Sequence, residues 1–227
     1  MKTVEELRKL LETGQTGFKP LKTIYSDTIV ATNGTTHNYD IVQGWDIGLA
    51  MQCDQEWGNF NMQLLEFIRQ ADPCSQEKLL ESSQLEDAHW NWLTKHKHYH
   101  SEQYNWFFFM SEEKPQAACL VYHPKVSVDT ADTIFYIEFL AVAPWNRPNH
   151  ISDQVFKGIG SILLKKVISY AEIELGITKG FSLHSLPKAE GYYQKIGMKR
   201  YEIYDKCGLG YFEMPEQQRA NFLGAMA

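Results

Sequence analysis

The stretch from Gln154 to Val167, "QVFKGIGSILLKKV", places two glycines directly before an apolar helical pattern. The apolar residues of this stretch recur at the spacing of one helix face, which predicts a helix over residues 158–175. Glycine lets a ligand approach the backbone closely, and the N-terminus of a helix attracts negative charge. Gly158 and Gly160 therefore predict a site for an anionic group at the start of this helix.

The segments on either side of this helix predict an alternating α/β arrangement. Upstream, buried strands are predicted over residues 104–110, 116–123 and 133–144, and the last of these ends at Pro144. Downstream, strands are predicted over residues 180–186, 199–205 and 209–214, with a short helix over 188–196. Strands that alternate with helices and end in an antiparallel pair indicate a mixed α/β sheet.

The first hundred residues predict a hairpin together with helices. A hairpin is predicted within residues 15–50, with its turn at Asn33-Gly34, and residues 54–100 are expected to be helical. One helix should end at Asp72-Pro73, and the next should begin with Ser75 as its N-cap. A further helical stripe is predicted at the start of the chain, formed by Val4, Leu7, Leu10 and Leu11 and stopped by Gly14.

Composition limits the classes of function. The chain has 227 residues, 44% of them hydrophobic, which suits one large globular domain or two small ones. Its formal net charge of −6 argues against a nucleic-acid binder, because phosphate contacts need clustered Lys and Arg, and fits an amine partner slightly better. No apolar run approaches the roughly 20 residues of a membrane span. We expect no signal peptide, and four free thiols in a cytoplasmic protein without a metal site.

Three motifs in order resemble those of the GNAT superfamily, the Gcn5-related N-acetyltransferases. The first motif ends a strand, the second opens the glycine-led helix, and the third follows in "AEGYYQKIGM". The residues that match are Leu140, Val142 and Pro144; Gly158 and Gly160; and Ala189, Tyr192, Tyr193, Lys195, Gly197 and Met198. Val155 stands where the family has Arg or Gln, with Gln154 one place away, and the loop from Pro144 to Gly158 is longer than is usual in the family.

The resemblance implies a fold and a domain organisation. We expect one domain over residues 1–227, with a mixed, mostly antiparallel twisted sheet, a splayed central strand pair and flanking helices. Residues 1–100 would supply the variable N-terminal region, residues 101–215 the acetyl-CoA-binding core, and residues 216–227 a C-terminal tail.

The resemblance also implies a cosubstrate, acetyl-CoA, and the residues that hold it. The amides of Gly158, Ile159, Gly160 and Ser161 would meet the pyrophosphate, with the helix dipole behind them. Arg147 or Lys157 would supply positive charge for the phosphates. The extended pantetheine arm would pair with an exposed strand edge, as an added strand does. That edge consists of Leu140, Ala141, Val142 and Ala143.

Acyl transfer to an amine requires a base, an oxyanion donor and an acid. The resemblance gives Tyr193 the position of the general acid that protonates the leaving thiolate, and the Val142 amide is expected to stabilise the oxyanion. Strand periodicity predicts that Glu138, Leu140 and Val142 share one face, which makes Glu138 a candidate base. His184, on the next strand, is the alternative base.

Two classes of function stay open from the sequence. The first is an N-acetyltransferase that moves an acetyl group to a small-molecule or peptide amine by direct attack in a ternary complex. The second is a catalytically silent, acyl-CoA-binding module that acts as a sensor or assembly part. In either case we expect a monomer or homodimer, with no nucleic-acid and no membrane partner.

Overall fold

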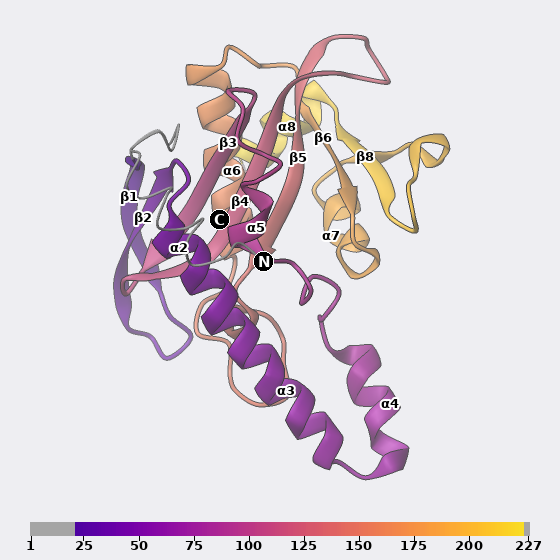
Figure 1. Ribbon diagram of the computed structural model, residues 1–227. Coiled ribbons are helices and arrows are strands. Elements are labelled where there is room, and N and C mark those ends of the chain that lie inside the picture. The colour runs from indigo at the N-terminus through magenta and orange to yellow at the C-terminus, as the bar shows by residue number, and fades with distance from the viewer. Residues whose placement is uncertain (1–20, 225–227) are drawn as a thin grey trace.

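The computed structural model describes residues 21–224, and the helix predicted near the start of the chain lies outside this range. The strands form one eight-stranded sheet in the order β1-β2-β3-β4-β5-β6-β8-β7 (Figure 1). Its members are β1 (Lys22–Val30), β2 (Thr36–Gln43), β3 (Tyr104–Ser111), β4 (Lys114–Val126), β5 (Thr133–Val142), β6 (Phe181–Ser185), β7 (Lys199–Arg200) and β8 (Gly210–Met214).

All neighbouring strands are antiparallel except β5 and β6. This parallel pair is short, because β6 contacts β5 only from Phe135 to Ile137. β5 continues to Val142 without β6, while β4 stays paired to it on the other side. The expected mixed, mostly antiparallel sheet with a splayed central pair is therefore confirmed.

Helices cover both faces of the sheet and divide the core in two. Helix α6 (Ile159–Glu174) packs on β3, β4 and β5, and α8 (Glu216–Gly224) is tied to it by the ion pair between Arg219 and Glu172. Helices α2 (Ile47–Gln52) and α5 (Trp92–Lys95) lie on the opposite face, with β4 and the tryptophan-rich part of the core. Among the helices that the structure describes, none has the length and apolar character of a bilayer span.

A helical hairpin extends from the α2 side of the sheet. α3 (Gly58–Gln70) and α4 (Pro73–Ser82) project beyond the sheet (Figure 1), and residues 83–91 lead back to α5. The N-cap of α4 is Asp72 rather than Ser75, because its carboxylate accepts hydrogen bonds from the amides of Cys74 and Ser75 and Pro73 occupies the first helical position. Part of this returning segment, residues 83–91, lines the cavity described below.

Three further sequence predictions are corrected by the structure. The helical pattern after residue 75 breaks at Ser83, so α4 and α5 are separate helices. The strand predicted over 199–205 is limited to Lys199–Arg200 and followed by a helical turn at Glu202–Tyr204. Most of the expected C-terminal tail is helix α8. The short helix predicted over residues 188–196 forms as α7 (Glu190–Lys195).

The long loop between β5 and α6 is fixed by a buried polar network. Gln116 of β4 is 2% exposed, and its Oε1 accepts hydrogen bonds from Trp145 Nε1 (2.8 Å) and Asn146 Nδ2 (2.8 Å). Asn146 Oδ1 in turn accepts from the Phe156 amide at 3.0 Å. The two ends of the loop, just after β5 and just before α6, are thereby held together.

We predict that Gln116→Met destabilises the protein and loosens this loop. Methionine fills a similar volume but leaves two buried N–H donors without an acceptor, at a cost of about 1–3 kcal/mol for each. Urea unfolding should give a lower midpoint, and limited proteolysis should cut first within residues 147–155. Gln217→Met, at an exposed position on α8, is the matched control. An unchanged midpoint in Gln116→Met would show that the network does not stabilise the loop.

Candidate functional site

A cavity of about 320 Å³ opens where β5 ends. The end of β5, the start of α6, helix α7 and the segment that follows α4 all line it. The residues around it are Gln84, Glu86, Asp87, Leu140, Ala141, Val142, Asn146, Arg147, Pro148, Gly158, Ile159, Gly160, Ser161, Leu186, Lys188, Ala189, Tyr192 and Tyr193. Nine of the thirteen residues expected to bind or react with acetyl-CoA thus lie around one space. They are Leu140, Ala141, Val142, Arg147, Gly158, Ile159, Gly160 and Ser161 from the cofactor set, with Tyr193.

The two glycines at the start of α6 have different structural roles. Gly158 is the N-cap and has a φ of +76°, in the left-handed region that glycine adopts without strain. Gly160 lies so close to β5 that an added Cβ would stand 3.1 Å from Val142 Cγ2. Gly160 therefore lets the helix approach the strand, and Gly158 turns the chain into the helix.

The first turn of α6 presents its backbone amides to this cavity. Its N-cap is a glycine and provides no side-chain hydrogen bond, and the Gly158 carbonyl already accepts from the Ile162 amide. The preceding amides of the turn, those of Ile159, Gly160 and Ser161, therefore lack the acceptor that a capping side chain provides. Uncapped amides together with the helix dipole form a site for an anion.

The free edge of β5 presents backbone groups from alternate residues. The Ala143 amide donates to the Gln116 carbonyl of β4 at 2.9 Å, so the backbone groups of Val142 and Leu140 point the other way, into the gap. Ala143 is fully buried and does not line the cavity. Leu140 and Val142 thus present backbone groups to the gap, as expected for the edge. Ala141 lines the cavity but does not present its backbone groups to the gap.

A β-bulge on β5 corrects the predicted strand face. Ile137 opposes Val121 and Phe139 opposes Leu120, so Glu138 is an extra residue on β5. Ile137 packs in the core under α6, whereas Phe139 packs in the tryptophan-rich core on the other face. Leu140 and Val142 then return to the α6 side. The prediction that Glu138 shares a face with these two residues is therefore wrong.

The guanidinium of Arg147 already binds other groups of the protein. Its guanidinium forms a two-pronged ion pair with Asp87, with Nη2 2.5 Å from Oδ2 and Nη1 2.7 Å from Oδ1. Its Nε donates to the Val142 carbonyl at 2.6 Å, and the side chains of Arg147 and Asp87 are 14% and 9% exposed. Arg147 thus ties the returning segment to the end of β5. Lys157 is exposed beside Gly158, outside the cavity lining, and stays the candidate for phosphate charge.

Tyr193 lines both this cavity and a second one. Tyr193 is 7% exposed, and burial raises the pKa of its hydroxyl well above the ordinary value, with smaller effects from Tyr192 and Cys119. The side chain therefore keeps its proton at neutral pH. Its neighbour Tyr192 forms a hydrogen bond to Ser161 Oγ at 2.8 Å, which fixes α7 against the start of α6.

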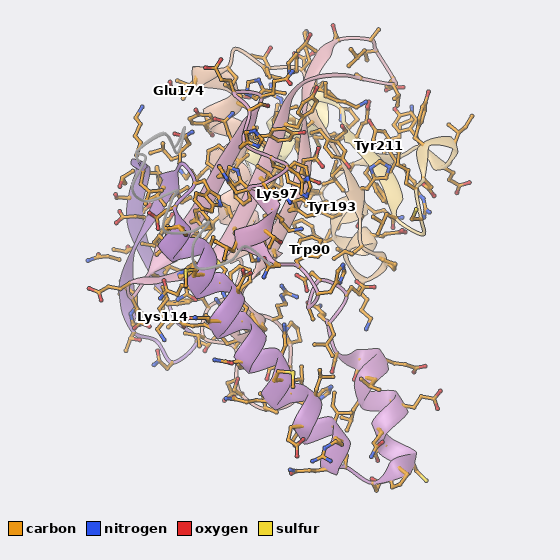
Figure 2. All side chains as sticks on the ribbon, in the orientation of Figure 1. Trp90, Lys97, Lys114, Glu174, Tyr193 and Tyr211 are labelled. Carbon is orange, nitrogen blue, oxygen red and sulfur yellow. The ribbon has the colours of Figure 1, made fainter. Side chains whose placement is uncertain are left out.

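The second cavity, of about 410 Å³, shares Leu140, Leu186, Ala189 and Tyr193 with the first. Trp90 and Tyr193, which lie close together in Figure 2 and come from distant parts of the chain, both line it. Glu138 lies on its wall, and burial raises the pKa of this carboxyl, although the ammonium groups of Lys206 and Lys95 oppose the shift.

His184 lines the same cavity, with both ring nitrogens engaged. Nε2 lies 2.9 Å from the Tyr204 carbonyl, which can only accept, so Nε2 carries a proton. In the neutral ring, Nδ1 then accepts a hydrogen bond from the Tyr136 hydroxyl at 2.6 Å. Burial lowers the pKa of His184, which favours this neutral form. The histidine orients Tyr136 beside Glu138.

Lys95 is a feature of the site that we did not predict. Its ammonium lies 3.3 Å from the centre of the Phe139 ring and 4.9 Å from that of Trp90. Burial lowers its pKa to about 8, although the carboxylates of Asp54, Glu138 and Asp87 oppose the shift. In the sequence it stands within the polar run "KHKHYH", which gives no sign of burial.

We predict that Lys95→Met makes the protein more stable at about pH 7. A folded-state pKa of about 8 lies below that of a free lysine, so charging Lys95 destabilises the folded state. The cost is fully present below the folded pKa and disappears as the pH rises above about 10, where the unfolded state also releases the proton. The advantage of the variant in urea unfolding should shrink over that window.

Lys97→Met, at an exposed neighbouring position, is the matched control and should change little. A Lys95→Met variant that is less stable than the wild type at about pH 7 would mean that the contacts of the ammonium with the rings outweigh its desolvation.

Comparison with known proteins finds similar solved structures at low sequence identity. No known protein family and no curated protein matches the sequence. Similar solved structures include the GNAT domain of S. lividans PAT, at 15% identity over 84% of this chain and 96% of that one, with a TM-score of 0.45. PaiA N-acetyltransferase from Thermoplasma acidophilum, in complex with coenzyme A, is 12% identical over 78% and 98%, with a TM-score of 0.49. Campylobacter jejuni N-acetyltransferase PseH is 17% identical over 70% and 94%, with a TM-score of 0.37.

Proposed function

We propose that this protein is an N-acetyltransferase that moves an acetyl group from acetyl-CoA to an amine. One observation carries the proposal: two adjoining cavities connect the uncapped amides of α6, the free edge of β5 and the Glu138 carboxyl, and Tyr193 lies where the cavities meet. A ligand with a phosphate at one end and an extended, amide-rich arm would satisfy the first two features together.

The groups at the first cavity match the parts of coenzyme A. The amides of Ile159, Gly160 and Ser161 would receive the pyrophosphate, and Lys157 would add positive charge from the exposed side. The Leu140 backbone would pair with the amides of the pantetheine arm, as in an added strand. The Val142 carbonyl already accepts from Arg147, so its amide is the group left to bind the acetyl oxygen.

The reaction follows from the groups around the junction of the cavities. Glu138 accepts a proton from the acceptor ammonium, directly or through a water, and its raised pKa suits a base better than that of an exposed carboxylate. The neutral amine attacks the thioester carbonyl, and the Val142 amide stabilises the oxyanion. When the carbon–sulfur bond breaks, the Tyr193 hydroxyl gives its proton to the leaving thiolate. The nitrogen of the new amide then releases its extra proton, which restores the Tyr193 hydroxyl. His184 orients Tyr136 and takes no proton, since both of its nitrogens are engaged.

We predict that Gly158→Asp weakens CoA binding far more than Gly158→Asn does. Both side chains tolerate the left-handed backbone at this position and have nearly the same shape, but only aspartate adds a negative charge beside the expected phosphates. With CoA at about a hundred times its dissociation constant, the wild type should gain about 2.7 kcal/mol of stability. Thermal-shift titrations should show that gain retained largely by the Asn variant and lost by the Asp variant. Equal gains in stability in both variants would show that the phosphates of CoA do not bind at this helix.

We predict that Tyr193→Phe lowers the turnover number while leaving CoA affinity nearly unchanged. The substitution removes only the hydroxyl, and general acid catalysis contributes about 100- to 10,000-fold. Release of free thiol at saturating amine measures turnover, and calorimetry measures CoA binding. Tyr192→Phe, which loses the bond to Ser161 but not the proposed acid, is the matched control. Full turnover in Tyr193→Phe would exclude its role as the acid. CoA binding by the wild type without turnover on any amine would favour a silent acyl-CoA module instead.

A further inference from the structure

A third cavity, of about 310 Å³, continues the acceptor side of the site outward. It shares Tyr136, Glu138, His184 and Lys206 with the cavity beyond Tyr193. The path therefore runs from Tyr193 past Glu138 to an outer chamber. That chamber is also lined by Tyr122, Lys125, Val128, Tyr204 and Tyr211.

Two lysines of the outer chamber lack an acidic partner. In the part of the chain that the structure describes, neither Lys125 nor Lys206 forms an ion pair with a carboxylate. Other lysines do: Lys114 pairs with Glu56, Lys179 with Glu216, and Lys199 with Asp129. Lys125 is half-buried as a residue, and Lys206 is exposed. Two ammonium groups that line one cavity without an ion-pair partner favour an anionic ligand.

A second bulge turns Lys125 into the chamber. On β4, Tyr122 opposes Tyr136 and Lys125 opposes Ile134, so two residues of β4 stand opposite Phe135 alone. Side chains three apart on a regular strand face opposite ways, but this extra residue places Tyr122 and Lys125 on the same cavity. The bulge thus gives the lysine a fixed direction that a regular strand would not.

A tight hairpin carries Lys206, the second lysine of the chamber. Lys206 and Leu209 form the bridge that closes the turn at Cys207-Gly208, where both residues have positive φ. Asp205, next to Lys206, pairs with Arg200 at 2.6 Å and accepts from the Tyr211 amide at 2.8 Å. Lys206 is therefore presented by an anchored loop.

The walls between these charges are aromatic and fixed. The Tyr211 hydroxyl donates to Glu213, a carboxylate that is 4% exposed, at 2.7 Å. The ring of Tyr211 lies 5.7 Å from that of Tyr204 and 5.0 Å from that of His184. The chamber is thus walled by aromatic rings, with Lys125 in its outer part and with Glu138 and Lys206 shared with the inner cavity.

From this arrangement we infer that the acceptor is an amine that also carries an anionic group, a carboxylate or a phosphate. Its ammonium meets Glu138 on the side of Tyr193, and its anion meets Lys125 and Lys206 in the outer chamber. A polyamine does not fit, because its second cation would stand beside two unpaired ammonium groups. This inference rests on the proposed function, whose acceptor cavity it specifies.

The test uses matched acceptors with the whole protein. L-amino acids are compared with their carboxamides, phosphoethanolamine with ethanolamine, and both sets with spermidine. We expect the anionic member of the productive pair to have a kcat/KM about tenfold higher or more, since hydrogen bonds between charged groups are among the stronger ones. A preference within the amino acids identifies a carboxylate, and a preference for phosphoethanolamine identifies a phosphate.

Variants of the two lysines locate the effect. Lys125→Gln and Lys206→Gln should each reduce the preference for the anionic acceptor, mainly through KM, while CoA binding is unaffected. Lys125→Glu should reverse the preference toward the neutral or cationic acceptor. Lys114→Gln, at an exposed lysine outside these cavities, is the matched control.

Calorimetry separates this inference from the proposed function. Anionic amines that bind to the CoA-loaded protein, and lose that binding in Lys125→Gln, support the inference even if no acetyl group is transferred. Turnover that favours spermidine or a carboxamide, or an anion preference that both lysine variants keep, overturns the inference and leaves acetyl transfer intact. Absence of binding by every anionic amine also overturns it.

Discussion

The parting of β5 from β6 is the constraint on which the rest of the site depends. β5 extends beyond Ile137 with only β4 beside it, and its free edge lies in the interior of the domain. Backbone groups away from water need partners. Arg147 satisfies the Val142 carbonyl, and the remaining groups of that edge face a cavity. The gap is thus the part of β5 beyond Ile137 that pairs with β4 but not with β6.

The ion pair between Arg147 and Asp87 joins the two halves of the site. Asp87 lies on the segment that returns from the α3–α4 hairpin, and the same segment contacts Lys188, whose ammonium donates to the Ser83 carbonyl at 2.6 Å. Residues 83–90 are thereby tied to both sides of the gap, to the end of β5 and to the start of α7. Trp90, three residues after Asp87, then lines the acceptor cavity. The region without recognisable motifs therefore shapes the acceptor side through contacts that only the folded chain brings together.

Local patterns predicted the elements and missed the irregularities. The hairpin at Asn33-Gly34, the strands β3 to β6 and β8, and the helix after Gly158 follow from turn residues, glycines and apolar periodicity, all of which are local. The bulge at Glu138 does not, because "FYIEFLAV" is an almost continuous apolar run without a bulge signal, and the extra residue is defined only by its position between the pairs with Leu120 and Val121.

The charged contacts of the site were even less accessible to sequence. Arg147 has the right charge and position for a phosphate ligand by every local criterion. It is taken up by Asp87, 60 residues away in the chain, and nothing in "SQLEDAHW" marks that carboxylate as a partner. Lys95, Lys125 and Lys206 look like solvated charges until the fold places them beside rings and cavities. A pairing between distant segments has no signature in a single sequence.

The net charge of the chain and the charge of its acceptor site point in opposite directions. A formal charge of −6 favours a cationic partner, yet the outer chamber has two unpaired lysines. The charges near the cavity determine which ligand is favoured, because at physiological salt an exposed charge is screened beyond about 8 Å. Several acidic groups are in any case neutralised by partners elsewhere, as Glu56, Glu216 and Asp129 are. An amine bound as we propose would lie near Glu138 and near the ammonium groups of Lys125 and Lys206. These local charges would orient a molecule that carries both signs, and the total charge of the chain does not reveal them.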